Sequence, residues 1–213
     1  MFKVGDYVKV IDGQKEPDYE SILMDNWYGQ ITGIDDNFIE VKLDLKTIAD
    51  LPIEYLLQLD QDGLSIEVII LESELFELAE KRKCSEDEKK LVESKLYWIS
   101  MFEDRAKDYV AYFSGTDVND DFSMHGKWME YLIERVEFPV MVKVVETMRG
   151  GLKLGTEIKL LDLEDIDEGY GILGIGKSNN GSVTWPICDL EVMNSELKAY
   201  RPLEDYRIWF ANM

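Results

Sequence analysis

Two matching stretches decide the fold: residues 2–12 read FKVGDYVKVID, and residues 152–162 read LKLGTEIKLLD. Nearly every position keeps its chemical class, and both stretches pass from a glycine into an alternation typical of a β-strand. A repeat that keeps its order while its loops change length indicates duplicated structure. We therefore predict two small SH3-like β-barrels related by an internal repeat. Further landmarks follow in the same order: Tyr28-Gly29 with Tyr170-Gly171, and Pro52-Ile53 with Pro186-Ile187.

The middle of the chain has a helical pattern. Ser85 and Glu88 have the spacing of a capping box, in which each side chain bonds the other residue's backbone N–H. Apolar residues then recur every three or four positions from Val92 to Phe113, which predicts one long amphipathic helix. Shorter helices are predicted over 72–82, 125–136 and 204–210.

These elements predict an α+β fold in which a helical section joins two barrels. The expected parts are an N-terminal SH3-like barrel over residues 1–70, a helical connector over 71–136, and a C-terminal barrel of calcium-binding type with a terminal helix over 137–213.

Composition limits the classes of partner. The chain has 44 acidic and 23 basic residues, a formal net charge of −21, and 46% hydrophobic residues, so it should fold despite its charge. A nucleic-acid backbone or an anionic membrane would be repelled. Cations or a basic protein partner are expected instead, and the oligomeric state is left open.

The expected location is the cytoplasm. The N-terminus begins with a strand-like alternation instead of the basic and apolar regions of a signal peptide. No uncharged apolar run approaches the roughly 18 residues of a membrane span. Cys84 and Cys188 belong to no metal-spaced or Cys-x-x-Cys set, and reduced thiols suit this address.

The stretch DLEDIDE, residues 162–168, places five carboxylates within seven residues and contains no basic residue. We expect a loop here, and either water or a cation must relieve the repulsion. Ca²⁺ accepts about six to eight oxygen ligands from carboxylates, carbonyls and water. The order differs from that of an EF-hand. The predicted calcium ligands are Asp162, Glu164, Asp165, Asp167 and Glu168, together with Asp189 or Glu191 brought near by the fold.

The C-terminal part also resembles a known family. From Trp128 onward it has a Phe-Pro pair at 138–139, the acidic stretch, and an end that reads PICDLE from Pro186 to Glu191. Tyr206 and Trp209 then lie in a final helix. This order resembles the small calcium-binding protein family first described in cyanobacteria, over about residues 128–210. The resemblance implies the same fold for this part and calcium as its ligand.

Catalytic signals are weak. His125 is the only histidine, so a nucleophilic triad would depend on it, and its place beside Gly126 suggests an exposed or capping residue. The glycines of GILGIGK, residues 171–177, lie in a strand pattern and lack the helix of a nucleotide fingerprint.

The function predicted from the sequence is a non-enzymatic calcium-binding protein, a buffer or a sensor, that uses the acidic loop of the C-terminal barrel. The alternative is a calcium-independent acidic adaptor of two SH3-like barrels that recruits a basic protein segment.

Overall fold

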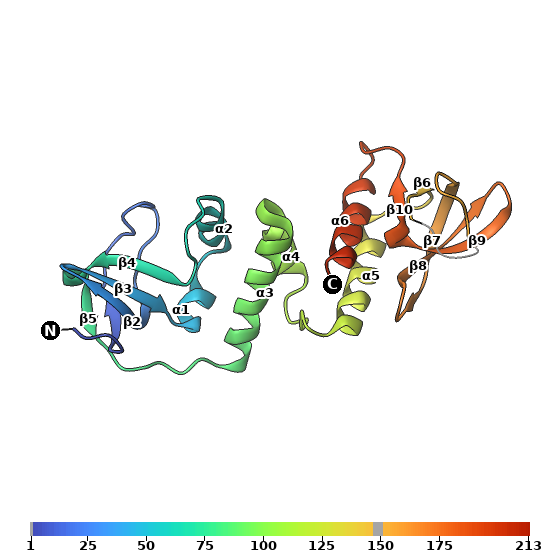
Figure 1. The fold of residues 1–213 in the computed structure, drawn as a ribbon. Helices are drawn as coiled ribbons and strands as arrows, with labels where there is room; N and C mark the ends of the chain where they lie inside the picture. The colour runs from blue at the N-terminus through green and yellow to red at the C-terminus, as the bar shows by residue number, and fades with distance from the viewer. Residues whose placement is uncertain (1, 147–150) are drawn as a thin grey trace. The chain divides into compact units, whose positions relative to one another are not determined.

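The computed structural model describes residues 2–146 and 151–213 (Figure 1). They form two compact units, Met1–Gly115 (unit 1) and Thr116–Met213 (unit 2). The fold class is mixed α+β, with a five-stranded antiparallel sheet in each unit. The predicted boundaries at 70/71 and 136/137 stay a prediction. No helix in the described part of the chain is both long and apolar enough to cross a membrane.

The sheet of unit 1 has the order β4-β3-β2-β1-β5. Val8 and Val10 of β1 are completely buried, as the alternation of residues 7–10 predicts. The strand predicted at the N-terminus is therefore present. Its strands are β1 (Tyr7–Val10), β2 (Tyr28–Asp35), β3 (Phe38–Leu43), β4 (Val68–Glu72) and β5 (Phe76–Leu78).

The predicted helix over 72–82 is wrong. Residues Ser73–Leu75 form the 3-10 turn η1, and Phe76–Leu78 form β5, which pairs with β1. Phe76 lies opposite Val10 and is buried. The segment thus completes a sheet edge, and this long-range pairing overrides a sequence that is locally favourable for a helix.

The predicted long helix is interrupted. The capping box at Ser85 is confirmed and opens α3 (Glu86–Phe102), but Glu103 has a φ of +47°. The 3-10 turn η2 (Glu103–Arg105) and α4 (Ala106–Tyr112) follow. The break allows Tyr109 to stack on Phe102, with ring centroids 4.4 Å apart. Two shorter helices, α1 (Leu45–Asp50) and α2 (Ile53–Gln61), connect β3 to β4.

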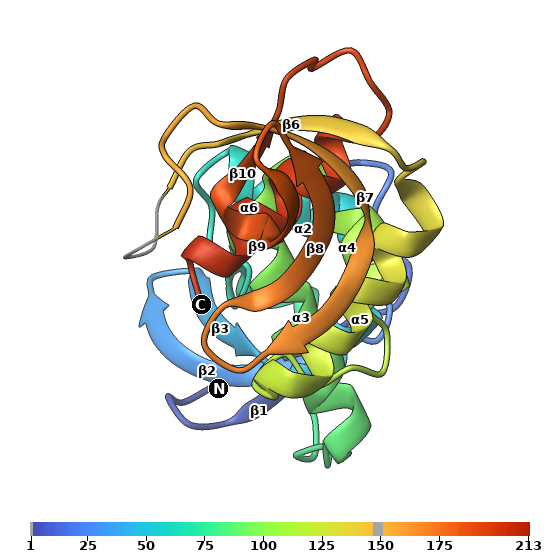
Figure 2. The same cartoon turned by 90° about the vertical axis from the view of Figure 1, so that its right-hand side faces the viewer.

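The sheet of unit 2 has the order β10-β6-β7-β8-β9, and β7 and β8 form a long curved ribbon (Figure 2). The 3-10 turn η3 (Ile187–Asp189) precedes β10, and α5 and α6 lie side by side. The predicted helices over 125–136 and 204–210 are both present and begin earlier than expected. The elements are α5 (Asp121–Arg135), β6 (Val140–Val144), β7 (Glu157–Asp167), β8 (Gly171–Ser178), β9 (Gly181–Pro186), β10 (Leu190–Val192) and α6 (Tyr200–Ala211).

His125 is neither exposed nor a cap, so that expectation is wrong. It lies inside α5, is 5% exposed, and packs edge-on against Trp209 at a centroid distance of 5.0 Å. Its Nδ1 lies 2.8 Å from the Asp121 carbonyl oxygen, which requires Nδ1 to be the protonated nitrogen. His125 is therefore a core residue of the α5–α6 contact.

The two sheets have the same strand order, counted along the chain within each unit, and each has a 3-10 turn before its last strand. In the described residues each order is linear with two edges, so closure into an SH3-like barrel is not confirmed. The matching stretches form the same local structure: Asp6 N donates to Lys3 O and Thr156 N donates to Lys153 O, both at 3.0 Å. However, they lead into β1 and β7. Counted along the chain, β1 is the first strand of its sheet and β7 is the second strand of the other. The whole-unit repeat therefore stays a prediction.

Candidate cation site

The acidic stretch lies mainly in a strand, so the predicted loop over 162–168 is wrong. Strand β7 runs to Asp167, and only Glu168 to Tyr170 form the turn into β8. The apolar residues between the acids explain this, because Leu160 and Leu163 are buried and hold the segment in the sheet. The strand contains irregularities between Leu160 and Asp162 and between Leu163 and Asp165. These β-bulges leave extra residues on one strand and redirect their side chains.

Three of the aspartates accept hydrogen bonds from nearby backbone. Asp162 Oδ1 accepts from Leu163 N at 2.9 Å, and Asp165 Oδ1 accepts from Ile166 N at 2.8 Å. Asp167 Oδ1 accepts from the N–H groups of Gly169 and Tyr170, at 2.8 and 3.0 Å. The last pair shapes the turn, since an Asp side chain that bonds backbone two residues on forms an Asx turn.

The two glutamates of the stretch are exposed. Glu164 Oε2 accepts a hydrogen bond from Thr184 Oγ1 of β9 at 2.8 Å. Glu168 lies in the turn itself, between Asp167 and Gly169. The ion pairs found in the described residues include none of the five acids, and the hydrogen bonds to these acids come from backbone N–H groups and one hydroxyl.

Asp189 lies in η3, beside the turn that follows β7. The Cys188 thiol contacts both the Tyr170 carbonyl oxygen, at 3.7 Å, and Asp189 Oδ1, at 3.6 Å. Burial raises the pKa of this thiol to about 12, so it stays protonated. The sulfur therefore links the end of the acidic stretch to Asp189.

A second carboxylate lies close to Asp189. Burial, and then the negative charge of Glu146, raise the pKa of Asp189. Its backbone carbonyl oxygen accepts from Val145 N at 2.9 Å, which brings the end of β6 to this place. Sequence reasoning missed Glu146, because it lies far from the acidic stretch in the chain and no local pattern marks it. Glu191, the alternative to Asp189, instead forms an ion pair with Lys143 at 3.0 Å.

The donor chemistry suits a hard cation, because every candidate offers carboxylate or carbonyl oxygen. The positions of these oxygen ligands fit a metal site less well than their chemistry does. Within residues 2–146 and 151–213, no three acidic, histidine or cysteine side chains converge closely enough to hold a metal ion. The structure thus brings Asp189 near the β7–β8 turn and leaves Asp162, Glu164 and Asp165 along the strand.

Comparison with known proteins finds a family that the C-terminal part resembles. Residues 116–210 match the model of the CcbP family, described as "Calcium binding", and these bounds nearly coincide with unit 2. The predicted resemblance to a calcium-binding family is confirmed. No curated protein matches the chain.

Two solved structures are similar in part. The crystal structure of CcbP from Anabaena is 20% identical and matches 45% of this chain and 80% of its own, with a TM-score of 0.38. A structure of a calcium binding protein in the calcium-binding form is also 20% identical, matches 45% of this chain and 81% of its own, and has the same TM-score of 0.38. At these values neither structure places a residue of this chain.

Proposed function

We propose that unit 2 binds Ca²⁺ and that the protein acts through binding, not catalysis. The observation that carries the proposal is the match of residues 116–210 to a family described by calcium binding, over bounds that nearly equal those of unit 2. The description names a ligand and no reaction. A strand with five carboxylates in the same unit supports calcium as the ligand, because a divalent cation would relieve their repulsion.

The proposed ligands are the six predicted acids, with the β7–β8 turn as their centre. The Cys188 thiol contacts both Tyr170 O and Asp189 Oδ1, so a carbonyl oxygen and a carboxylate oxygen both lie next to this thiol. Glu146, whose charge acts on Asp189, joins this set as a seventh candidate. The six are Asp162, Glu164, Asp165, Asp167, Glu168 and Asp189.

Binding requires a local rearrangement. Asp165 and Asp167 each use one oxygen to accept backbone hydrogen bonds and would turn the second oxygen, or the whole carboxylate, toward the ion. The pairing of β7 with β6 ends at Leu160, but its pairing with β8 continues to Asp167, so we expect the change to be confined to side chains and the turn. We therefore favour a buffer over a sensor, since a sensor exposes a new surface on binding.

Calorimetric titration of EDTA-treated protein with CaCl₂ tests the proposal. We expect saturable heat, and a melting temperature that rises with calcium, because a ligand that binds only the folded state stabilises it by about 2.7 kcal/mol at a hundredfold excess over Kd. The buffer assignment predicts that the binding of a hydrophobic dye stays unchanged. An absence of heat together with an unchanged melting temperature at millimolar calcium would reject calcium binding.

A further inference from the structure

The free edge of strand β4 in unit 1 presents unused backbone groups. β4 pairs only with β3. The bonds Leu43 N to Glu67 O, 2.8 Å, and Ser73 N to Asn37 O, 2.7 Å, lie at the two ends of this pairing. Because bonded and non-bonded pairs alternate in an antiparallel ladder, the N–H and C=O groups of Ile70 and the N–H of Glu72 point away from β3. The Glu72 carbonyl belongs to the N-cap of η1 and is not counted among the unused groups. Val68 N also points away and is bonded to Ser65 Oγ at 3.1 Å.

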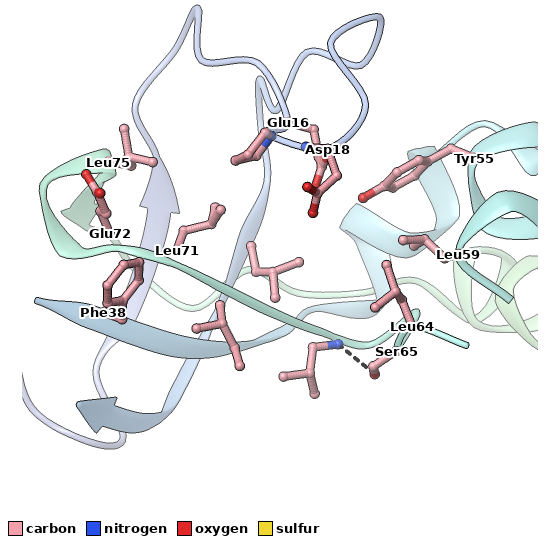
Figure 3. A pocket seen from close by; sticks show the side chains of 14 residues that line it. Glu16, Asp18, Phe38, Tyr55, Leu59, Leu64, Ser65, Leu71, Glu72 and Leu75 are labelled. Carbon is pink, nitrogen blue, oxygen red and sulfur yellow. Dashed lines mark hydrogen bonds between the residues drawn. The ribbon is translucent and has the colours of Figure 1, made fainter. Parts of the chain in front are cut away.

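A groove of about 690 Å³ runs along this edge (Figure 3). All five residues of β4 border it. Successive side chains of a strand point to opposite faces, so a cavity bordered by every residue follows the backbone edge and not one face. The opposite wall contains Tyr55 and Leu59 of α2 and the segment from Glu16 to Asp18.

The groove is apolar with an acidic rim. Its floor and walls are mainly leucine, isoleucine and aromatic side chains, and its three charged residues are Glu16, Asp18 and Glu72. Glu16 is 9% exposed and is held in place by the N–H groups of Asp18 and Tyr19, at 2.8 and 2.5 Å. No lysine or arginine lines the groove. Its charge complements a segment that carries basic side chains.

β4 differs from the other three sheet edges of the described residues. β5 and β10 have only three residues each, and β9 contains Ser182 and Thr184 and ends at Pro186. Short length, polar residues and proline are the usual protection of an edge against pairing with another chain. β4 reads VIILE, with no proline or lysine, and Ile70 is 63% exposed.

We propose that the β4 edge and its groove bind an extended segment of a basic protein partner by strand addition. The partner's backbone would bond the outward N–H and C=O of Ile70 and the outward N–H of Glu72. Alternate apolar side chains would fill the groove, and a lysine or arginine would meet Glu16 and Asp18. A second copy of this chain is a poor occupant, because two chains of net charge −21 repel. The site is in unit 1 and does not require calcium.

Fluorescence anisotropy of the full chain with a labelled peptide of about six residues that alternates valine and lysine tests this inference. We expect saturable binding that weakens as salt rises, is equal in EDTA and in calcium, and is absent for the matched valine–glutamate peptide. Failure of the calcium titration would leave this result unaffected, so the two proposals fail separately. Binding of both peptides with equal affinity would overturn the charge argument and the proposal.

Two variants at one position separate backbone pairing from apolar contact. Ile70→Pro removes the outward N–H. No bond to β3 is lost, because this N–H points away from β3, and proline is tolerated at such an edge position. We expect Ile70→Pro to weaken peptide binding about tenfold, because the peptide loses roughly one hydrogen bond to the strand. Ile70→Val keeps the N–H and should bind within about twofold of the unchanged chain.

Circular dichroism and the melting temperature verify that both variants fold. Equal peptide affinities of the folded Ile70→Pro and Ile70→Val chains would overturn strand addition. Self-association of the unchanged chain in sedimentation that Ile70→Pro abolishes, with no peptide binding, would assign the edge to a second copy and refute the basic partner.

Discussion

The two sheets differ in how they compensate their acidic side chains. In unit 1, Glu77 and Glu67 are paired with lysines of neighbouring strands: Lys9 Nζ lies 2.7 Å from Glu77, and Lys42 Nζ lies 2.9 Å from Glu67. In unit 2 the five acids of residues 162–168 have no such cation among the described residues, although Lys159 and Lys177 face each other further along the same ribbon. Lysines therefore compensate these two glutamates of unit 1, as Lys143 does Glu191 in unit 2, whereas the carboxylate row of residues 162–168 is left open to an external cation.

A shared landmark makes the comparison testable at single residues. Each unit has a glycine after a tyrosine, Gly29 in β2 and Gly171 in β8, at which an added Cβ would collide with its surroundings. At Gly29 the obstacles belong to the neighbouring strand, at Lys42 and Val41. At Gly171 they belong to α6, at Tyr206 and Phe210. The Tyr206 hydroxyl oxygen also accepts a hydrogen bond close to this point, from Ile172 N at 2.8 Å.

The largest expected effect is that of Gly171→Ala. Its φ of +68° disfavours a side chain, and the new methyl would lie 2.6 Å from Phe210 Cε2. Strain and overpacking together should destabilise unit 2 by about 2 to 4 kcal/mol. Native-state hydrogen exchange would measure this loss in the amides of unit 2, with those of unit 1 unchanged.

Gly169→Ala, two residues earlier, is the matched control. Only Asp167 Oδ1 lies near its added Cβ, at 3.6 Å, so we expect a change within about 0.5 kcal/mol. Equal effects of the two substitutions would show that α6 does not pack against Gly171.

Double substitution Asp165→Asn and Asp167→Asn should lower calcium affinity about a hundredfold. Asparagine keeps the oxygen that accepts from Ile166, Gly169 and Tyr170, so the turn is preserved while two charges are lost. Ligand charge is what sets calcium affinity in oxygen sites. Calorimetric titration measures the change.

The control substitutes the same number of charges in unit 1, as Glu67→Gln with Glu77→Gln. These acids are already paired with lysine, so calcium affinity should be unchanged. Equal losses in both double variants would mean that calcium responds to net charge alone, and the proposed site would be refuted.

Sequence reasoning succeeded where the signal is local. The capping box at Ser85 and the glycine turns at Gly5 and Gly155 depend on residues three or four positions apart, and the structure contains all three. The helix prediction for residues 72–82 failed because the conformation of this segment depends on its pairing with β1, which is distant in the sequence. The prediction of one unbroken helix failed at Glu103, because the apolar period continues across this residue and gives no sign of the turn.

The candidate site shows the same limit. The acidic row could be found by composition, but its conformation could not, because charged residues are uncommon in strands and the burial of Leu160 and Leu163 outweighs that preference. Glu146 could not be found at all, since only the fold brings the end of β6 to Asp189. The predicted barrels and repeat extend a local match, the Lys-x-Gly turn, to whole units.

The two glycine turns sharpen this point. Gly5 and Gly155 have φ values of +94° and +77°, and an added Cβ would meet no atom within 4 Å at either. Gly5→Ala and Gly155→Ala should therefore each cost about 1 kcal/mol, from backbone strain alone. Hydrogen exchange at increasing denaturant concentration monitors the unfolding of each unit and measures the cost of both substitutions. A cost at one turn that is several times the other would show that the matching stretches are not structurally equivalent.

The smallest expected effect is a gain in stability from Asp189→Asn without calcium. Burial and then Glu146 raise the pKa of Asp189, so the folded state holds its proton more tightly than the unfolded state does. That stabilisation is complete below the unfolded pKa and is lost as pH rises through the raised folded pKa. At neutral pH the ionised carboxylate is therefore unfavourable, and Asn should stabilise unit 2 in EDTA by at most about 1 kcal/mol, because a half-exposed charge is screened.

With calcium the sign reverses, since a ligand carboxylate must be ionised to bind. Asp189→Asn should lower calcium affinity several-fold, and the unchanged chain should bind calcium more tightly as pH rises through the Asp189 pKa. Melting temperatures in EDTA and in calcium, measured across pH for both chains, test the two signs together. A variant less stable in EDTA, with unaltered calcium affinity, would give Asp189 a purely structural role, and the comparison would then depend on the β7 carboxylates alone.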